Sequence, residues 1–472
     1  MKKKILLCLG ICALAMASMA QVPPISHIDA NNVRGTVLGN GTIFLNYQSD
    51  DDINPCPSWE VPMGSGKSTV FQKSLWIGGL DASDQLYLAA MRYGQTASVQ
   101  GGGQDYWSGP LTTTDATLDL VTALKYHHIW SLTSAEIEQF KANYNNTAYQ
   151  IPEDILTWPA HGEGDYAQDL APFVDVNGDG RYTPADGDYP DIKGDHCLFF
   201  IFNDNYKAHT ESNGLPLGVE VHAMVYAFEA PNDEALDNTV FTHYKMINRS
   251  SRDYHDVYLG LWYDWDIGYA QDDYVGCDVR RNSFYAYNGY EIDGNGEPSS
   301  YGDNCPTQVT TILSTPENLG MTGFMYHNND ASVTGDPKEA EEYYLFLRGC
   351  WKDGVHMQYG GNAYPGTPGC VGPECNYMYP GDSDPDNIGT NGIAPNEGYN
   401  TNGKYWTDEE AGNEPFDRRG LGMVGPFVFP AGSVKELDLA EITVWKNSSA
   451  SAMERCGEFI DQIISFFNNL KK

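Results

Sequence analysis

Five residues in a short acidic segment have the types and spacing of calcium ligands. Asp175, Asn177 and Asp179 stand at its first, third and fifth positions, Arg181 at its seventh and Asp186 at its twelfth. Calcium takes six to eight oxygen ligands at about 2.3–2.6 Å, and these side chains, with the backbone carbonyl of the seventh residue, can surround it in one tight loop. A ligand-free Asp-, Asn- and Gly-rich turn is the alternative. We predict a structural calcium ion held by these five residues.

The residues after this loop do not continue like a common calcium-binding domain. The loop resembles those of EF-hands and cellulosomal dockerins, in which a long helix follows. Pro184 and Pro190 exclude such a helix here, because proline in a helix interior removes a hydrogen bond and clashes with the preceding turn. The resemblance therefore covers the ligand loop and not the domain around it.

A second group of acidic residues follows a strand-like run at 257–263. Asp264, Asp266, Asp272 and Asp273 lie within a few residues of one another. A strand that ends at this point would bring several carboxylates to one end of a sheet, and carboxylate oxygens suit hard divalent cations. These four residues are weaker candidates for a second cation site. A solvated turn is the competing interpretation.

The chain lacks the local motifs of several enzyme classes. It contains no G-x-S-x-G nucleophile elbow and no H-E-x-x-H zinc helix. Residues 64–69 (GSGKST) resemble a P-loop, but Val61 stands where that motif needs glycine. We assign no catalytic residue and no organic cofactor, which favours a protein that is not an enzyme. A glycosidase needs only two carboxylates, however, and the chain has 64 acidic residues.

The tryptophans have two interpretations. Indole rings can stack on sugars, and they can equally fill the core of a β protein. The residues concerned are Trp107, Trp130, Trp158, Trp262, Trp265 and Trp406.

The overall charge excludes several kinds of partner. The 472 residues include 64 acidic and 28 basic ones, which gives a net charge of −36. Nucleic-acid binding needs a basic surface, so we exclude it, and charge gives no attraction to anionic lipid. A hydrophobic content of 41% argues against a disordered acidic tail. The excess negative charge favours cations as ligands.

The N-terminus predicts export. Residues 1–20 show three lysines, an apolar run and a small-residue cleavage site ending at Ala20, the pattern of a secretory signal peptide. No later apolar run is long enough to span a membrane. We therefore expect an extracellular or cell-surface protein, with the periplasm as the alternative.

The cysteines then suggest disulfides. Eight of them follow the signal peptide, and an even number in an exported chain favours pairing. We expect Cys370 and Cys375 to close a local loop.

Periodicity and turn residues predict a mainly β protein with an antiparallel β-sandwich architecture and long loops. Four strand-like runs between residues 197 and 265 are separated by Asn, Asp, Gly and Pro turns. Capping boxes at Thr133/Glu136 and Ser451/Glu454 predict a short helix near 133–144 and a C-terminal helix. The apolar stripe of the C-terminal helix should pack on the β core.

We divide the sequence into five segments by composition. They are a signal peptide (1–20), an N-terminal β-rich region with one helix (21–165), the calcium loop plus β-sandwich (166–350), a Gly-, Pro-, Asn- and Asp-rich surface excursion (351–416), and returning strands with the C-terminal helix (417–472).

Several segments resemble a largely uncharacterised family of exported surface proteins of the Bacteroidota, associated with type IX secretion or gliding-motility cargo. They are WEVPMGSGK (59–67), SLWIGGLD (74–81), YWSGPL (106–111), WPAHG (158–162), residues 175–195, DWDIG (264–268) and DDYVGCD (272–278). The resemblance extends from about residue 50 to the C-terminus and implies export but no particular activity. Members often continue into a C-terminal sorting domain, whereas this sequence ends at Lys472, directly after the expected helix. Periplasmic residence or release as a soluble protein is therefore an alternative to surface anchoring.

Three functions fit these features. The first is a calcium-stabilised surface or extracellular protein with a structural or adhesive role, whose partner is a glycan or another surface protein. The second is a secreted protein that binds or cleaves carbohydrate. The third is a self-associating subunit of an extracellular filament or surface layer.

Overall fold

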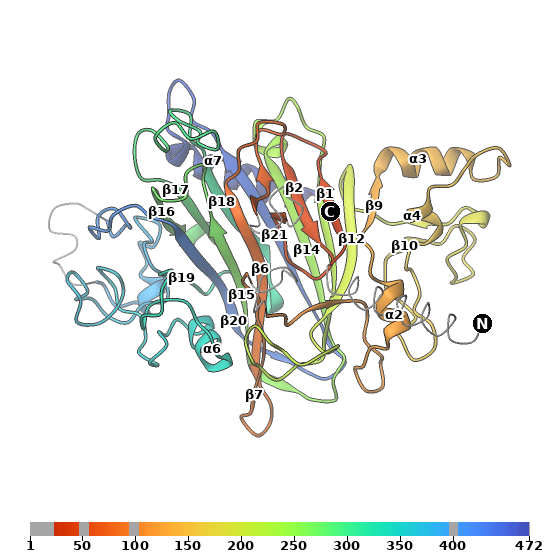
Figure 1. Cartoon of the computed structure of the whole chain (residues 1–472), viewed down its shortest axis with the longest axis horizontal. Coiled ribbons are helices and arrows are strands. Elements are labelled where there is room, and N and C mark those ends of the chain that lie inside the picture. Colours follow the sequence, from red (N-terminus) through yellow and green to blue (C-terminus); the bar gives the residue numbers. More distant parts are fainter. Residues whose placement is uncertain (1–22, 47–55, 94–102, 396–404, 472) are drawn as a thin grey trace, which may run out of the picture.

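A computed structural model of the chain describes residues 23–46, 56–93, 103–395 and 405–471. The expected signal peptide at 1–20 lies outside these residues. Two large antiparallel sheets pack face to face (Figure 1), so the prediction of a mainly β, antiparallel sandwich-type protein is confirmed. Within the described residues, no helix is both long and apolar enough to cross a membrane.

The larger sheet has nine strands. Eight follow the order β16-β17-β18-β21-β14-β13-β12-β8, and β9 also pairs with β12. The strands are β8 (Trp107–Ser108), β9 (Trp130–Thr133), β12 (His196–Asn203), β13 (Val219–Ala227), β14 (Thr239–Asn248), β16 (Asp273–Asp278), β17 (Ser283–Asn288), β18 (Thr307–Ser314) and β21 (Val434–Val444).

The second sheet has five strands in the order β19-β20-β15-β6-β7. They are β6 (Val70–Leu80), β7 (Leu86–Ala89), β15 (Tyr254–Trp265), β19 (Gly323–His327) and β20 (Arg418–Phe429). Smaller sheets join β1 (Ile25–Ile28), β2 (Arg34–Leu38) and β5 (Trp59–Glu60); β3 (Leu45–Asn46) and β4 (Cys56–Pro57); and β10 (Phe173–Val174) and β11 (Tyr189–Pro190).

The nine-stranded sheet is covered on both faces. On β13, Val221, Ala223 and Val225 join the core between the two sheets, while Met224 joins a second apolar cluster on the opposite face. This alternation follows from the two-residue period of a strand. Because both faces are covered, every residue of β13 is buried.

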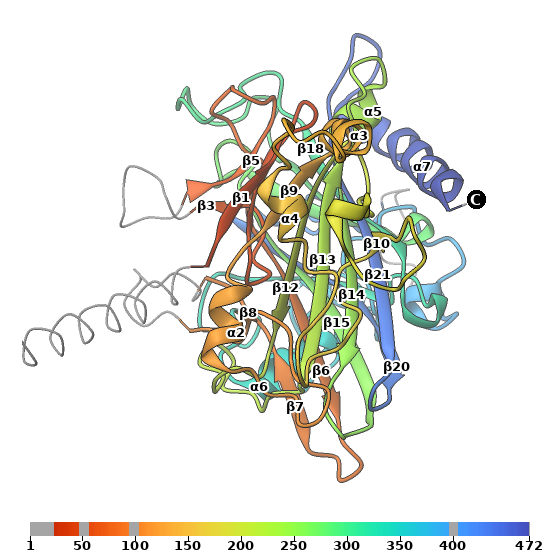
Figure 2. The same cartoon turned by 90° about the vertical axis from the view of Figure 1, so that its right-hand side faces the viewer.

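Both predicted helices are present. α3 (Ser134–Asn143) begins with the Thr133/Glu136 capping box and α7 (Ala452–Leu470) with the Ser451/Glu454 box. The stripe of α7 is buried on the outer face of the nine-stranded sheet, against β18 and β21 (Figure 2). The other helical elements of the described residues are α2 (Leu120–Lys125), α4 (Glu153–Leu156), α5 (Glu234–Asp237), α6 (Ala340–Leu347) and the single 3-10 turns η1 (Pro184–Asp186), η2 (Val279–Arg281), η3 (Pro316–Asn318) and η4 (Ile388–Thr390).

In the described residues, the last four of these segments share the same sheets and core. β6 of segment 21–165 pairs with β15 of segment 166–350, and β20 and β21 of segment 417–472 lie inside the two large sheets. The excursion at 351–416 contains no strand or α-helix in its described part. It is nevertheless anchored, because Tyr377, Tyr379 and Trp406 are buried in the main core.

The cysteines form no disulfide in the described part of the chain, so that expectation is wrong there. Cys197, Cys277, Cys305, Cys350, Cys370, Cys375 and Cys456 are free thiols. The expected bridge between Cys370 and Cys375 is absent because the two thiols pack differently. Cys375 is buried in the core, whereas the Sγ of Cys370 lies 3.7 Å from the backbone oxygen of Gln358. Buried cysteine behaves as a small apolar residue, and burial raises the pKa of both thiols.

Candidate metal centre

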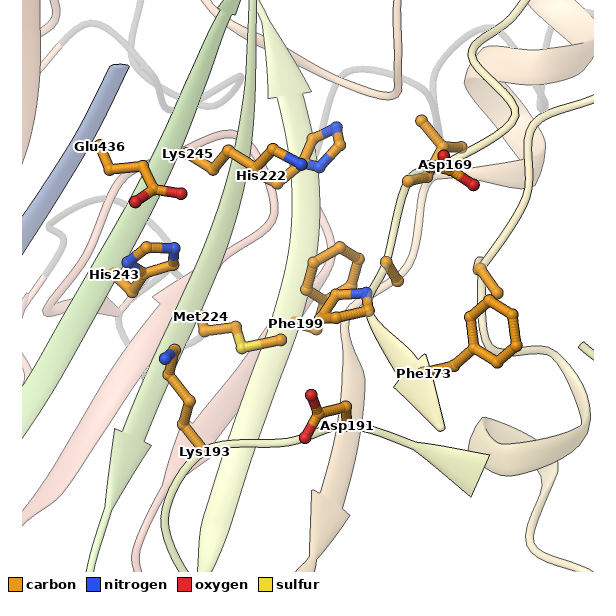
Figure 3. A pocket seen from close by; sticks show the side chains of 14 residues that line it. Asp169, Phe173, Asp191, Lys193, Phe199, His222, Met224, His243, Lys245 and Glu436 are labelled. Atoms are coloured by element: carbon orange, nitrogen blue, oxygen red, sulfur yellow. The ribbon is translucent and has the colours of Figure 1, made fainter. Parts of the chain in front are cut away.

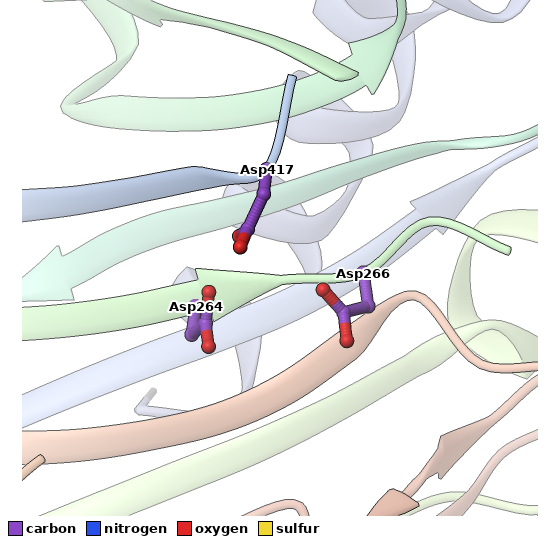
Figure 4. A group of neighbouring side chains, drawn as sticks. All are labelled: Asp264, Asp266 and Asp417. Carbon is purple, nitrogen blue, oxygen red and sulfur yellow. The ribbon is translucent and has the colours of Figure 1, made fainter. Parts of the chain in front are cut away.

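Three aspartates from two neighbouring strands converge at one end of the five-stranded sheet. Asp264 lies at the end of β15, Asp266 follows it, and Asp417 directly precedes β20. One carboxylate oxygen of each lies within 4.8 Å of the others, and Figure 4 shows the Asp417 carboxylate reaching toward the other two. The β15–β20 pairing produces this arrangement, because it places Asp264 opposite Arg419 and so brings Asp417 alongside.

Positive charge at the cluster comes from Arg419. Its Nη1 donates to Asp417 Oδ1 at 2.9 Å, and its Nη2 lies 3.5 Å from Asp264 Oδ2. The Tyr93 hydroxyl donates to the same Asp264 oxygen at 2.8 Å. One guanidinium thus faces three carboxylates, which leaves excess negative charge when all three are ionised.

The second oxygen of Asp264 has no partner. Asp264 is 3% exposed, and its Oδ1 is buried without a hydrogen bond to any described residue. An unpaired buried oxygen of this kind costs about 1–3 kcal/mol, and more when the group is charged. The cluster therefore contains a desolvated acceptor that a bound cation would satisfy.

Burial and mutual repulsion make ionisation of these groups costly. Burial, with smaller contributions from Asp266 and Asp417, raises the pKa of Asp264 well above its usual range. Burial and then the charge of Asp417 raise the pKa of Asp266 to about 7. A divalent cation would reverse this effect, since an opposite charge at close range favours the ionised form.

Carboxylate oxygens determine which metal fits. An all-oxygen set suits calcium, magnesium or manganese rather than zinc or copper, which prefer nitrogen and sulfur ligands. Three carboxylates supply part of the six to eight oxygens that calcium takes, and backbone carbonyls or water would complete the shell.

Asp272 and Asp273 do not join this cluster. Asp272 Oδ2 accepts a hydrogen bond from the backbone of Gly294, and Asp273 Oδ2 accepts one from Ile267. Each also has a buried second oxygen without a described partner. The four weaker candidates are thus divided, with Asp264 and Asp266 in the cluster and the other two beside it.

The predicted calcium loop connects β10 and β11. Asp175 binds the loop backbone, since its Oδ1 accepts from Gly178 at 2.7 Å and its Oδ2 accepts from Gly180 at 2.7 Å. Both glycines have positive φ, the sharp turn expected at the sixth position. Asp179 Oδ1 accepts from the Arg181 backbone at 2.8 Å.

The carboxylates of the loop do not converge as those of the aspartate cluster do. Asp179 and Asp186 are exposed and Asp175 is partly exposed, and the three form no set within 4.8 Å. The buried carboxylate at the base of the loop is instead Asp188, which accepts from the backbones of Val176 and Thr183, each at 2.8 Å. Sequence analysis missed Asp188 because it lies beyond the twelve-residue pattern.

A separate cavity of about 470 Å³ lies on the outer face of the nine-stranded sheet (Figure 3). Phe199 and Met224 supply apolar surface, and Lys193 and Lys245 supply positive charge. His222, His243, Asp169, Asp191 and Glu436 also line it. Apolar surface with a few charged groups is typical of small-molecule sites.

The six tryptophans considered for sugar stacking are all buried. Trp265 stacks with Tyr263 between the two sheets, whereas Trp262 lies on the opposite face of β15, stacked on Trp76. Trp130 and Trp158 lie in the outer cluster. Packing is therefore the role that the structure gives them.

No protein-family model matches this chain, and no curated protein matches it.

Asp417 is the ligand candidate that sequence analysis missed. It lies about 150 residues from Asp264 in the chain, and the sequence around it is not a ligand pattern. In the sequence, Asp417 is marked only by its position directly before a strand-like run, and acidic residues at such positions are common.

Proposed function

We propose that this protein is an exported, cation-stabilised β-sandwich with a structural or adhesive role outside the cytoplasm. The observation that carries the proposal is the Asp264, Asp266 and Asp417 cluster, with its buried unpaired oxygen. Calcium would neutralise this cluster and would also bind the 175–186 loop. The signal-like residues 1–20 and the resemblance to exported surface proteins support the location.

The two sites would act on different parts of the molecule. A cation at the cluster would tie the end of β15 to the start of β20 inside the five-stranded sheet. A cation in the loop would fix the β10–β11 hairpin. A ligand that binds only the folded state stabilises it, by about 2.7 kcal/mol at a hundred times its Kd.

Calcium should therefore raise the melting temperature of the purified protein by several degrees relative to EDTA. Calorimetric titration should show that the double variant Asp266→Asn/Asp417→Asn loses one class of sites and Asp175→Asn/Asp179→Asn loses the other. The matched control is Asp382→Asn/Asp386→Asn, which removes the same charge from exposed positions and should bind calcium as the wild type does.

Three outcomes would contradict the proposal. One is an equal melting temperature with calcium and with EDTA. The second is calcium binding that survives in both double variants, and the third is an equal loss of binding in the control.

The cavity of Figure 3 supports a second candidate function, the binding or cleavage of carbohydrate. Charged groups such as Lys245 and Asp191 could hydrogen-bond sugar hydroxyls above the apolar surface of Phe199 and Met224. We expect a glycan array to show specific retention that Lys245→Ala loses and that Lys207→Ala, at an exposed position outside the cavity, retains. Release of reducing ends from a bound polysaccharide would make the protein an enzyme. Absence of retention, or equal retention by both variants, would remove this candidate.

A further inference from the structure

A lysine and a glutamate contact each other in the core between the two large sheets. Lys73 lies on β6 of the five-stranded sheet and Glu441 on β21 of the nine-stranded sheet. The Lys73 Nζ pairs with Glu441 Oε1, and both side chains are 0% exposed. The pair therefore bridges the two sheets in a region without access to solvent.

Burial of Lys73 favours an uncharged amine. Cation–π attraction to the rings of Phe44, Tyr244 and Tyr263, whose centres lie 5.6–5.9 Å from its Nζ, acts in the opposite direction. Burial lowers the pKa of Lys73, against the opposing effect of Glu441. Transfer of one proton within the pair gives a neutral amine and a neutral carboxylic acid, which a low-dielectric core accommodates at less cost than two charges. A neutral buried lysine is a nucleophile.

Two hydroxyl groups form hydrogen bonds with the atoms that would react. The Tyr263 hydroxyl donates to Glu441 Oε1 at 2.8 Å, and strand pairing sets Tyr263 directly opposite Lys73. The Thr242 hydroxyl accepts from Lys73 Nζ at 3.1 Å and donates to Glu441 Oε2 at 3.4 Å. One hydroxyl thus polarises the carbonyl oxygen, and the other links the amine to the second carboxyl oxygen. Thr242 and Tyr263 are themselves fully buried.

We propose that Lys73 and Glu441 condense in the folded protein, so that an amide bond joins the two sheets of the sandwich. The amine nitrogen of Lys73 attacks Cδ of the Glu441 carboxylic acid. The Thr242 hydroxyl relays two protons from Nζ to Oε2: the first forms the neutral acid with its proton on Oε2, and the second leaves the nitrogen after the attack. Oε2 then carries two protons and leaves as water. Oε1 remains as the amide oxygen and still accepts the hydrogen bond from the Tyr263 hydroxyl. The reaction needs no oxidant, cofactor or cation.

Folding supplies the driving force for this condensation. Two groups held in contact react with effective molarities that reach about 10⁵–10⁸ M, because the entropy cost of bringing them together has already been met. The product also replaces two ionisable groups, whose burial as ions costs several kcal/mol each, with one neutral amide. A covalent tie between the sheets would suit a protein that bears load outside the cell.

Mass spectrometry of the denatured, reduced wild-type protein tests the proposal. The cross-link removes one water, about 18 Da. Tryptic digestion should give a branched peptide that joins residues 68–92 to residues 436–446, with no cleavage after Lys73. The branched peptide is the decisive readout, since it does not depend on processing of the N-terminus.

Lys73→Arg is the matched control, because it keeps a basic side chain in the core while guanidinium is not a nucleophile at ordinary pH. We expect this variant to show the full mass and no branched peptide. Tyr263→Phe removes only the hydroxyl that polarises Oε1, and it should lower the fraction cross-linked soon after folding. The Tyr263→Phe variant also keeps the proposal testable if Lys73→Arg does not fold.

Two results would overturn the proposal. In the first, the wild type has its full mass and yields residues 68–73, 74–92 and 436–446 as separate peptides, so the pair is an ion pair only. In the second, one water is lost in both the wild type and Lys73→Arg without a branched peptide, so the dehydration lies elsewhere. A cross-linked fraction that Tyr263→Phe leaves unchanged would remove Tyr263 from the reaction.

Discussion

Replacing Arg419 by methionine is expected to lower the free energy of unfolding of the calcium-free protein by about 3–5 kcal/mol. Arg419 is 5% exposed and contacts Asp264, Asp417 and the hydroxyl of Tyr93. Its removal would leave a desolvated cluster of carboxylates without the cation that now faces them. Calcium should recover part of the loss, so the stabilisation by calcium should be larger in the variant than in the wild type.

Denaturant unfolding in EDTA and in calcium, for both proteins, measures this effect. Arg280→Met is the control, because Arg280 is exposed and surface changes usually alter stability by less than about 0.5 kcal/mol. The loss should also be smaller at about pH 5 than at about pH 8, since the raised pKa values of Asp264 and Asp266 allow protons to neutralise the cluster at low pH. An Arg419→Met protein as stable as the control would exclude charge balance as the role of Arg419.

The second large effect is an acid transition controlled by Glu220. Glu220 is fully buried on β13 and accepts hydrogen bonds from His222 at 2.7 Å, Arg249 at 2.8 Å and the Leu111 backbone at 2.6 Å. Burial alone would raise its pKa, but the hydrogen bonds and charges of His222 and Arg249 outweigh burial and lower the pKa to about 2. The folded-state pKa thus lies below the unfolded value near 4.5.

A lowered carboxyl pKa stabilises the folded state above the unfolded pKa, and this contribution is lost as the pH falls through the folded pKa. Glu220 should therefore contribute about 3 kcal/mol above pH 5 and lose it between about pH 4.5 and pH 2. The measurement is the difference in unfolding free energy between wild type and Glu220→Gln across this range. We expect this difference to become smaller as the pH falls. Free energies of unfolding that change in parallel with pH in the two proteins would contradict the assignment.

Local features of the chain were predictable where neighbours in sequence are neighbours in space. Thr133 and Glu136 form their capping box within one helical turn, so their types and spacing were sufficient to predict the start of α3. Cys456, Phe459 and Ile463 share one helical face for the same reason, and that face is buried. The strand-like runs between residues 197 and 265 became β12, β13, β14 and β15 because a two-residue period follows directly from the backbone.

Features that depend on distant segments were not predictable in this way. The composition of residues 351–416 indicated an irregular excursion, yet Tyr377, Tyr379 and Trp406 anchor it in the core. The cysteine count suggested disulfides, but the described cysteines are free because most pack as apolar side chains in separate places. Asp264 and Asp266 were candidates from their spacing, whereas Asp272 and Asp273 turned out to bind backbone groups beside the cluster.

The sequence by itself determined the mainly β class, the two capped helices, the large negative charge and a loop with calcium-ligand spacing, because each depends on composition or on residues close together in the chain. Tertiary structure alone decided that Asp417 and Arg419 face Asp264, and that Lys73 meets Glu441 across 368 positions of sequence. The physical reason is that strand pairing and the packing of two sheets set these contacts. Neither leaves a local pattern at the residues that it brings together.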